Sequence, residues 1–130
     1  MREILFRGKC KTDNEWLYGF PYVTRKNAVK INWYCSEFGS MRTDEVDPET
    51  VGQYTGLTDK NGKRIYEGDI VKSNHCAYVI MWDSVKAMFY LRDPVSMVTS
   101  DFYNYFGSDL TVIGNIHDNP EILKGGGDNG

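Results

Sequence analysis

His75 and Cys76 are the adjacent pair that most invites chemistry, since a thiol beside an imidazole can serve as a nucleophile or a metal ligand. Asp69 lies nearby in the chain. However, neighbouring residues of a strand point to opposite faces, and zinc motifs usually space their ligands by about two to four residues. We therefore expect no catalytic centre and no metal here, and we interpret Cys76 as a small apolar core residue.

The remaining acids and thiols also lack a recognisable constellation. The pairs Asp44–Glu45 and Asp47–Glu49 fall in turn-rich sequence, where solvation or helix capping accounts for carboxylates. The three cysteines are an odd number without a CxxC pair, which is typical of reduced thiols. The sequence thus predicts no enzyme and no cofactor.

Charge and hydropathy exclude other classes. Fifteen basic and 18 acidic residues are mixed along the 130-residue chain, so no domain-scale field attracts nucleic acid. No apolar run approaches the roughly 20 residues of a membrane-spanning helix, and charges at positions 2, 3 and 7 do not fit a secretory signal. We expect a cytoplasmic protein.

Aromatic residues are the richest chemical resource of the chain, with nine Tyr, six Phe and three Trp. More aromatic side chains than a small core requires often mark an interface. The candidate binding residues are aromatic or basic and lie in two segments: Arg25, Lys26, Lys30, Trp33, Tyr34, Tyr103 and Tyr105. Bases interleaved with aromatics are also typical of single-stranded nucleic-acid grooves, so this remains the alternative.

Strands must position these side chains. Residues 15–23 and 28–35 alternate with period two, and the four residues between them suit a hairpin loop. Pro21 removes a ladder donor and favours an edge position or a bulge near the end of its strand. The polar stretch 36–49 predicts a long loop that closes with a helical turn at 47–50.

The second half of the chain predicts further turns and strands. Asn61-Gly62 predicts a tight type I′ turn, and a second turn at 67–69 precedes a strand. Residues 76–82 and 86–91 predict a hairpin, and 111–116 predict a final strand. Helical turns are expected near 100–106 and 119–123, followed by a flexible Gly-rich tail at 125–130.

These elements predict a mainly β fold, either a small antiparallel β-barrel or two packed β-subunits, in a single domain over 1–124. One core is enough for a chain of this length.

Four blocks of the sequence resemble the YopX family of phage and prophage proteins: Arg2–Arg7 (REILFR), Trp16–Gly19 (WLYG), Asp47–Val71 (DPETVGQYTGLTDKNGKRIYEGDIV) and Val112–Glu121 (VIGNIHDNPE). The resemblance implies a compact β-rich phage or prophage protein that can self-associate, and it carries no enzyme activity or cofactor. The central block could be a binding loop, but its glycines and apolar residues favour an architectural role. The segments Val23–Val46 and Lys72–Leu110 depart from the shared blocks, and we expect contact surfaces there.

From these observations we expect a non-enzymatic accessory protein that binds another protein, a host or phage factor, and that forms a homo-oligomer. Single-stranded nucleic-acid binding by a small β-barrel is the alternative function, and a membrane is not an expected partner.

Overall fold

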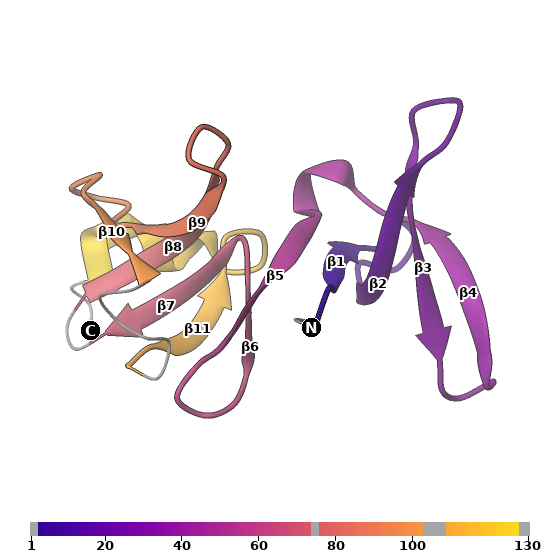
Figure 1. Ribbon diagram of the computed structural model, residues 1–130, viewed down its shortest axis with the longest axis horizontal. Coiled ribbons are helices and arrows are strands. Elements are labelled where there is room, and N and C mark those ends of the chain that lie inside the picture. The colour runs from indigo at the N-terminus through magenta and orange to yellow at the C-terminus, as the bar shows by residue number, and fades with distance from the viewer. Residues whose placement is uncertain (1–2, 74–75, 103–108, 128–130) are drawn as a thin grey trace. The chain divides into compact units, whose positions relative to one another are not determined.

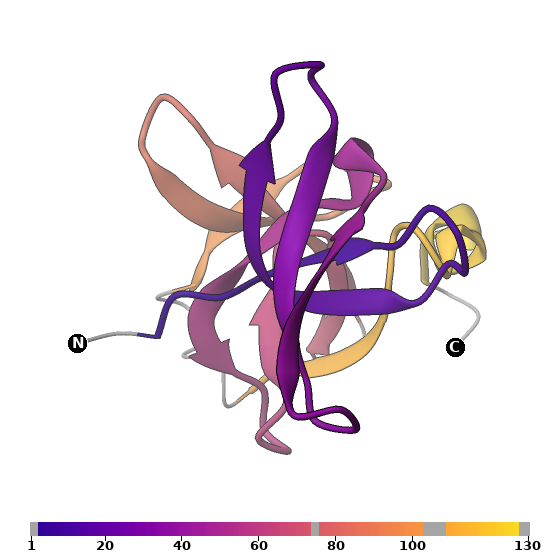
Figure 2. The ribbon, with the colours of Figure 1, turned by 90° about the vertical axis from the view of Figure 1, so that its right-hand side faces the viewer.

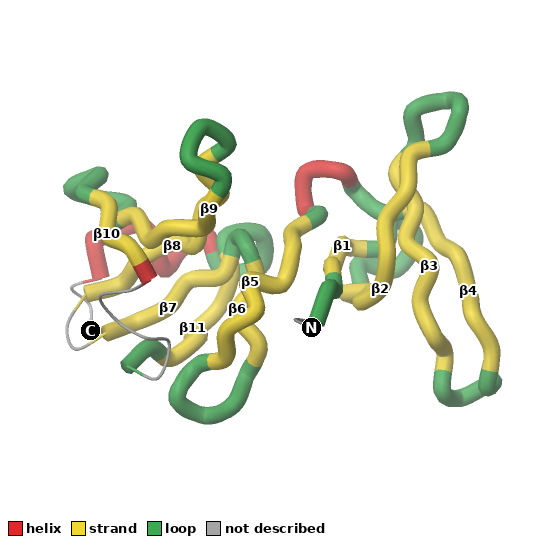
Figure 3. The backbone as a smooth tube through the Cα atoms, in the orientation of Figure 1, coloured by secondary structure: helices red, strands yellow, loops and turns green. Residues whose placement is uncertain are grey.

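The chain is mainly β, as predicted. The computed structural model describes residues 3–73, 76–102 and 109–127, and strands make up most of that part of the chain (yellow in Figure 3). The chain divides into two compact units, Met1–Tyr54 and Thr55–Gly130. Within the described residues, no helix has both the length and the hydropathy needed to span a bilayer.

The strands form two antiparallel sheets, and the chain passes from one unit to the other within β5. The larger sheet has the order β4 (Ser40–Glu45), β3 (Val29–Cys35), β2 (Trp16–Val23), β1 (Phe6–Lys9), β5 (Gly52–Thr58) and β6 (Arg64–Tyr66). The smaller sheet has the order β10 (Thr99–Asp101), β9 (Met88–Arg92), β8 (Cys76–Asp83), β7 (Asp69–Ser73) and β11 (Thr111–Asn115). The 3₁₀ segments η1 (Pro48–Thr50) and η3 (Pro120–Gly127, the yellow coil in Figure 2) accompany them.

The predicted hairpin of the first unit is confirmed, since β2 pairs with β3 from Gly19↔Trp33 to Val23↔Val29. Pro21 lies in an otherwise central strand, but β1 accompanies β2 only as far as Gly19. The end of β2 that contains Pro21 is therefore paired on one side alone, and this satisfies the constraint that a missing N–H imposes.

The expectation of a long loop over 36–49 is wrong. Residues 40–45 form β4, which pairs with β3 in the register Trp33↔Arg42 and Tyr34↔Met41. The polar run of β4 has little strand signal of its own, so the pairing with β3 overrides local propensity. The helical turn at 47–50 is confirmed as η1, where the Asp47 side chain accepts a hydrogen bond from the Glu49 N–H.

The sheet of the first unit curls until the chain after β1 meets the chain after β4 (β1 and β4 in Figure 1). Cys10 and Val46 form an isolated antiparallel β-bridge, and the Lys11 N–H donates to the Glu45 carbonyl at 3.0 Å. The Asp47 N–H donates to the Lys9 carbonyl at 2.9 Å. This contact joins the two strands at one end only, so the predicted closed barrel is not confirmed among the described residues.

The curl creates a small core and one very close backbone approach. Four buried residues form the core of this unit: Cys10, Leu17, Ile31 and Val46. A Cβ placed on Gly19 of β2 would lie 1.9 Å from the Asn32 carbonyl oxygen of β3. Only glycine fits there, which gives the Gly of the WLYG block a structural reason.

The second unit contains the larger core and most of the predicted turns. The buried residues that form this core cluster are Ile65, Val71, Ile80, Leu91 and Leu110. The predicted hairpin 76–91 is confirmed as β8 and β9, with Trp82 and Phe89 opposite each other and their rings 4.9 Å apart. The final strand is confirmed as β11, and the terminal helical turn as η3.

Three details of the second unit differ from expectation. The turn at Asn61-Gly62 has positive φ at Gly62 alone, so it is not type I′, which requires it at both residues. Residues 99–101 form β10 instead of starting a helical turn, because they pair with β9. Phe102 has the 3₁₀ conformation that this prediction expects, and residues 103–106, including Tyr103 and Tyr105, fall outside the described residues. Cys76 is exposed, so its assignment to the core is wrong.

The Asp59 carboxylate is the hub of the second unit. One of its oxygens accepts from the N–H groups of Asn61 and Lys63 within the turn, and the other accepts from the Val112 N–H at the start of β11. Asp59 is only 4% exposed. Burial by itself would raise the pKa of Asp59, but the three N–H donors and the Lys63 charge hold it below the ordinary value of 3.8.

We expect Gly19→Ala to destabilise the fold by roughly 1–3 kcal/mol or more, because the new methyl group meets backbone that cannot rotate away. Gly62→Ala is the control, since nothing lies within 4 Å of that position and only the positive φ opposes a side chain. Urea unfolding of both variants measures the difference. Equal losses at the two positions would contradict the steric explanation.

We expect Asp59→Ala to lower the free energy of unfolding by about 3 kcal/mol, because each buried donor left unsatisfied costs roughly 1–3 kcal/mol. The comparison is Asp83→Ala, which removes an acceptor from two N–H groups in an exposed turn and should cost under about 1 kcal/mol. Chemical denaturation monitored by circular dichroism measures both values.

At acidic pH, the stabilisation that the Asp59 carboxylate contributes to folding should be lost. Because its folded-state pKa is lowered, its stabilisation is complete above the unfolded value and is lost as pH falls through the folded value. The stability gap between wild type and Asp59→Ala should therefore be constant at neutral pH and shrink below pH 3.8. A gap that stays unchanged down to complete acid unfolding would argue against the charged carboxylate as its source.

Candidate functional site

The first unit carries an exposed aromatic face on β2, β3 and β4. Strand alternation and cross-strand register place five large side chains on this one face: Tyr18, Phe20, Tyr22, Tyr34 and Met41. All five are between 43% and 60% exposed. We call this set the aromatic face. Its members are neighbours across the sheet, in contrast to the scattered apolar residues that are normal on a surface.

Charged groups border the aromatic face on both sides. Lys30 lies opposite Tyr22 on β2 and opposite Glu45 on β4, so a base and an acid lie side by side at this border of the aromatic face. At the other end of β2, the Arg7 guanidinium stacks over the Trp16 ring at 4.6 Å and the Lys9 ammonium lies 5.7 Å from it. These cation–π contacts occupy Trp16 within the unit itself.

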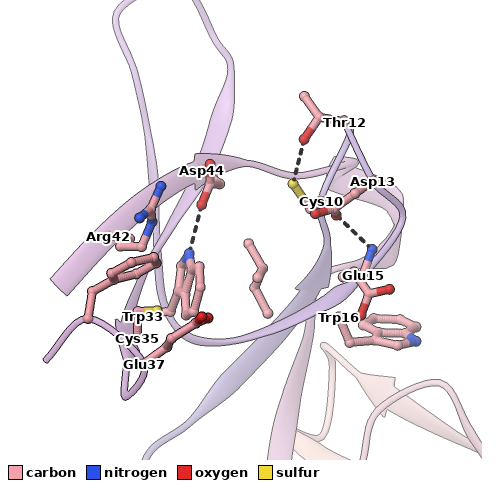
Figure 4. A pocket seen from close by; sticks show the side chains of 12 residues that line it. Cys10, Thr12, Asp13, Glu15, Trp16, Trp33, Cys35, Glu37, Arg42 and Asp44 are labelled. Carbon is pink, nitrogen blue, oxygen red and sulfur yellow. Dashed lines mark hydrogen bonds between the residues drawn. The ribbon is translucent and has the colours of Figure 1, made fainter. Parts of the chain in front are cut away.

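The opposite, inner face of the same sheet opens into a pocket of about 550 Å³ (Figure 4). The turn after β1, strands β2 and β3, the turn after β3, and β4 provide the lining: Cys10, Thr12, Asp13, Glu15, Trp16, Leu17, Trp33, Cys35, Glu37, Phe38, Arg42 and Asp44. Such a volume lies in the range of roughly 300–1,000 Å³ found for small-ligand sites. The cavity beside the curled sheet is therefore large enough to hold a small ligand or a side chain of a partner.

Hydrogen bonds fix part of the pocket wall. The Trp33 indole N–H donates to the Asp44 carboxylate at 2.9 Å, which ties β3 to β4. The Cys10 thiol lies 3.2 Å from the Thr12 hydroxyl. Figure 4 shows Cys10 and Cys35 on opposite sides of the cavity, so their thiols do not form a pair.

The pocket combines aromatic rings with an excess of acid. Trp33 and Phe38 contribute rings to its lining beside Trp16, whose ring already contacts Arg7 and Lys9. The lining also contains four carboxylates and a single guanidinium, that of Arg42. The Arg42 guanidinium lies 5.6 Å from the Phe38 ring. Aromatic rings and carboxylates in one pocket favour a ligand that carries a cationic group on an apolar chain.

The structure separates the binding residues that the sequence grouped. Lys30 and Tyr34 lie on the aromatic-face side of β3, whereas Trp33 lies on the pocket side. Arg25 and Lys26 are exposed in the β2–β3 turn. Tyr103 and Tyr105 lie outside the described residues. No single surface brings the whole predicted set together, because alternate residues of a strand point to opposite faces.

Sequence reasoning missed most of the pocket. Arg42 and Asp44 were assigned to a loop, and Cys10 and Glu37 carried no pattern of their own. The one usable signal is the alternation of Trp33 and Cys35 with Tyr34, which predicts two distinct faces for β3. The contact of Cys10 with Val46 joins positions too far apart in sequence to be found by periodicity.

Carboxyl groups with lowered pKa lie in turns. The N–H groups of Val95 and Ser96 hold the pKa of Asp93 below its ordinary value, despite an opposing effect of burial. Like Asp59, Asp93 stabilises local backbone, and this explains its shift without acid–base chemistry. Among residues 3–73, 76–102 and 109–127, no three His, Cys, Asp or Glu side chains are grouped closely enough to hold a metal ion.

Comparisons with known proteins place this fold. The chain is similar to a solved structure, the crystal structure of protein EF1440 from Enterococcus faecalis. The TM-score is 0.59 at 24% identity, over 95% of this chain and 100% of that one, which is a likeness of fold. No curated protein matches the chain. The model of the family described as YopX protein matches residues 5–124, and this range includes residues of both units. The chain therefore belongs to the YopX family.

Proposed function

We propose that this protein is a non-enzymatic phage or prophage accessory protein that binds another protein through the aromatic face of its first unit. The partner is a host factor, and self-association through the same face is the related case. The site of action is the cytoplasm of the host cell. Phage or prophage origin is part of the proposal, and the family resemblance of the sequence blocks supports it.

The aromatic face is the observation that carries this proposal. Five large side chains of β2, β3 and β4 lie on one surface and are 43–60% exposed. Tyrosine, phenylalanine and methionine are enriched at protein interfaces, where burial of their large area drives association. Two members of the face, Tyr34 and Met41, lie in the segment Val23–Val46 that departs from the shared blocks, and Phe20 and Tyr22 lie between the WLYG block and that segment.

Single-stranded nucleic acid is the alternative ligand of this surface, favoured by Lys30 opposite Tyr22 and by Tyr34 on the same face of β3. Two observations weigh against it. Glu45 lies directly opposite Lys30 and offsets its charge. Trp33, which the sequence included in the stacking set, lines the pocket on the other side of the sheet. The mixed charge supports a protein partner more than a phosphate backbone.

We expect the double variant Phe20→Ser/Tyr34→Ser to lose partner binding, since truncating a central interface aromatic costs about 2 kcal/mol or more, roughly 30-fold in affinity. The measurement has two arms: sedimentation velocity for self-association, and quantitative cross-linking in host lysate for a heterologous partner. Both mutated residues are exposed, so the fold should persist, and circular dichroism checks it.

Val85→Ser is the matched control, because Val85 is an exposed apolar residue in a turn of the other unit. It should leave both arms unchanged. The proposal fails if wild type neither self-associates nor forms a saturable complex, or if Val85→Ser and the double variant behave alike. Salt-sensitive binding of a single-stranded oligonucleotide that the double variant loses would instead establish the alternative.

A further inference from the structure

The edge of β4 is open for pairing. Among the described residues, β4 pairs with β3 alone, and β4 ends the strand order of its sheet. The Glu45 carbonyl points away from β3, since it accepts from the Lys11 N–H. In an antiparallel ladder the N–H and C=O of one residue point the same way and alternate along the strand, so Met41 and Thr43 direct theirs toward the open edge.

This edge is accessible and borders the pocket. Ser40, Met41, Arg42 and Thr43 are all exposed. Arg42 and Asp44, the alternate residues of β4, line the pocket, whereas Met41 belongs to the aromatic face. A strand added to this edge would therefore place every second side chain beside the pocket and the others beside the aromatic face.

The charge of the pocket lining indicates which side chains of an added strand would fit there. The carboxylates of Asp13, Glu15, Glu37 and Asp44 stand against the single guanidinium of Arg42. Arginine suits this lining best, because its planar guanidinium stacks on aromatic rings and bonds carboxylates in pairs. The other side of the strand would lie beside Met41, whose cross-strand neighbour on β3 is Tyr34, and this favours an apolar side chain.

We infer that the open edge of β4 and the adjoining pocket bind an extended segment of a partner protein in which arginine and apolar residues alternate. This inference rests on the proposed protein-binding function and names the chemistry of the partner. Backbone hydrogen bonds to Met41 and Thr43 hold the segment, and the pocket carboxylates select its arginines.

The first test uses a short capped peptide of alternating arginine and valine, measured by isothermal titration calorimetry on the full chain. Glu15→Gln/Glu37→Gln should weaken binding about tenfold or more, as should replacing arginine by citrulline. Both glutamates are exposed, so the variant should fold. The control Glu49→Gln, an exposed carboxylate of the same unit outside the pocket, should stay within about twofold of wild type.

The second test separates strand addition from simple charge attraction. In an antiparallel arrangement, like the other strand pairs of the first unit, the peptide residues directly opposite Met41 and Thr43 exchange hydrogen bonds with them and share the aromatic-face side, so they are the valines. N-methylation of the valine amides should abolish binding, whereas N-methylation of the arginine amides should be tolerated. The Trp33 indole N–H resonance should shift on titration with the unmodified peptide, because Trp33 lines the pocket.

Several outcomes would overturn the inference: no binding of the alternating peptide, equal loss with Glu49→Gln, or equal effects of the two N-methylation patterns. A peptide with the same composition in separate arginine and valine blocks must also bind more weakly. If the peptide fails while Phe20→Ser/Tyr34→Ser still abolishes a protein complex, this inference falls and the proposed function stands.

Discussion

The one-ended closure of the first unit is the constraint on which its surfaces depend. The bridge between Cys10 and Val46 and the bond from Lys11 to Glu45 join the chain after β1 to the end of β4, and the contact stops there. A contact along the whole of β4 would pair the backbone groups at its free edge and would leave no space for the pocket. Because it stops at Glu45, residues 40–44 keep an open edge and a pocket of about 550 Å³ lies beside them.

Because alternate residues of a strand point to opposite faces, β3 contributes side chains to two different surfaces. Along β3, Trp33 and Cys35 line the pocket while Tyr34 extends from the other side of the sheet. Next to Trp33, the backbones of β2 and β3 approach each other closely at Gly19 and Asn32. A partner that pairs with the edge of β4 can contact both faces at once, because its own side chains alternate with the same period.

The second unit depends on a buried charge. Asp59 joins the turn of the central block to the start of the late block through its bond to Val112. Asn115 also bonds backbone through its side chain, since its side-chain oxygen accepts from the N–H groups of His117 and Asp118. Asp59 and Asn115, one in each of these blocks, thus bond backbone within the fold, which agrees with an architectural role for Asp47–Val71.

Local patterns in the sequence determined the mainly β fold, the β2–β3 and β8–β9 hairpins, the turn capped by Asp47 and the family, because period-two alternation and turn residues act over a few positions. Tertiary structure alone decided that the polar run Ser40–Glu45 is a strand, because its pairing with β3 supplies what its propensity lacks. It also decided that Gly62 alone has positive φ in its turn, and that Tyr34 and Trp33 serve different surfaces. The pocket arose in the same way, since long-range contacts such as Cys10 with Val46 assemble it and leave no periodic trace in the sequence.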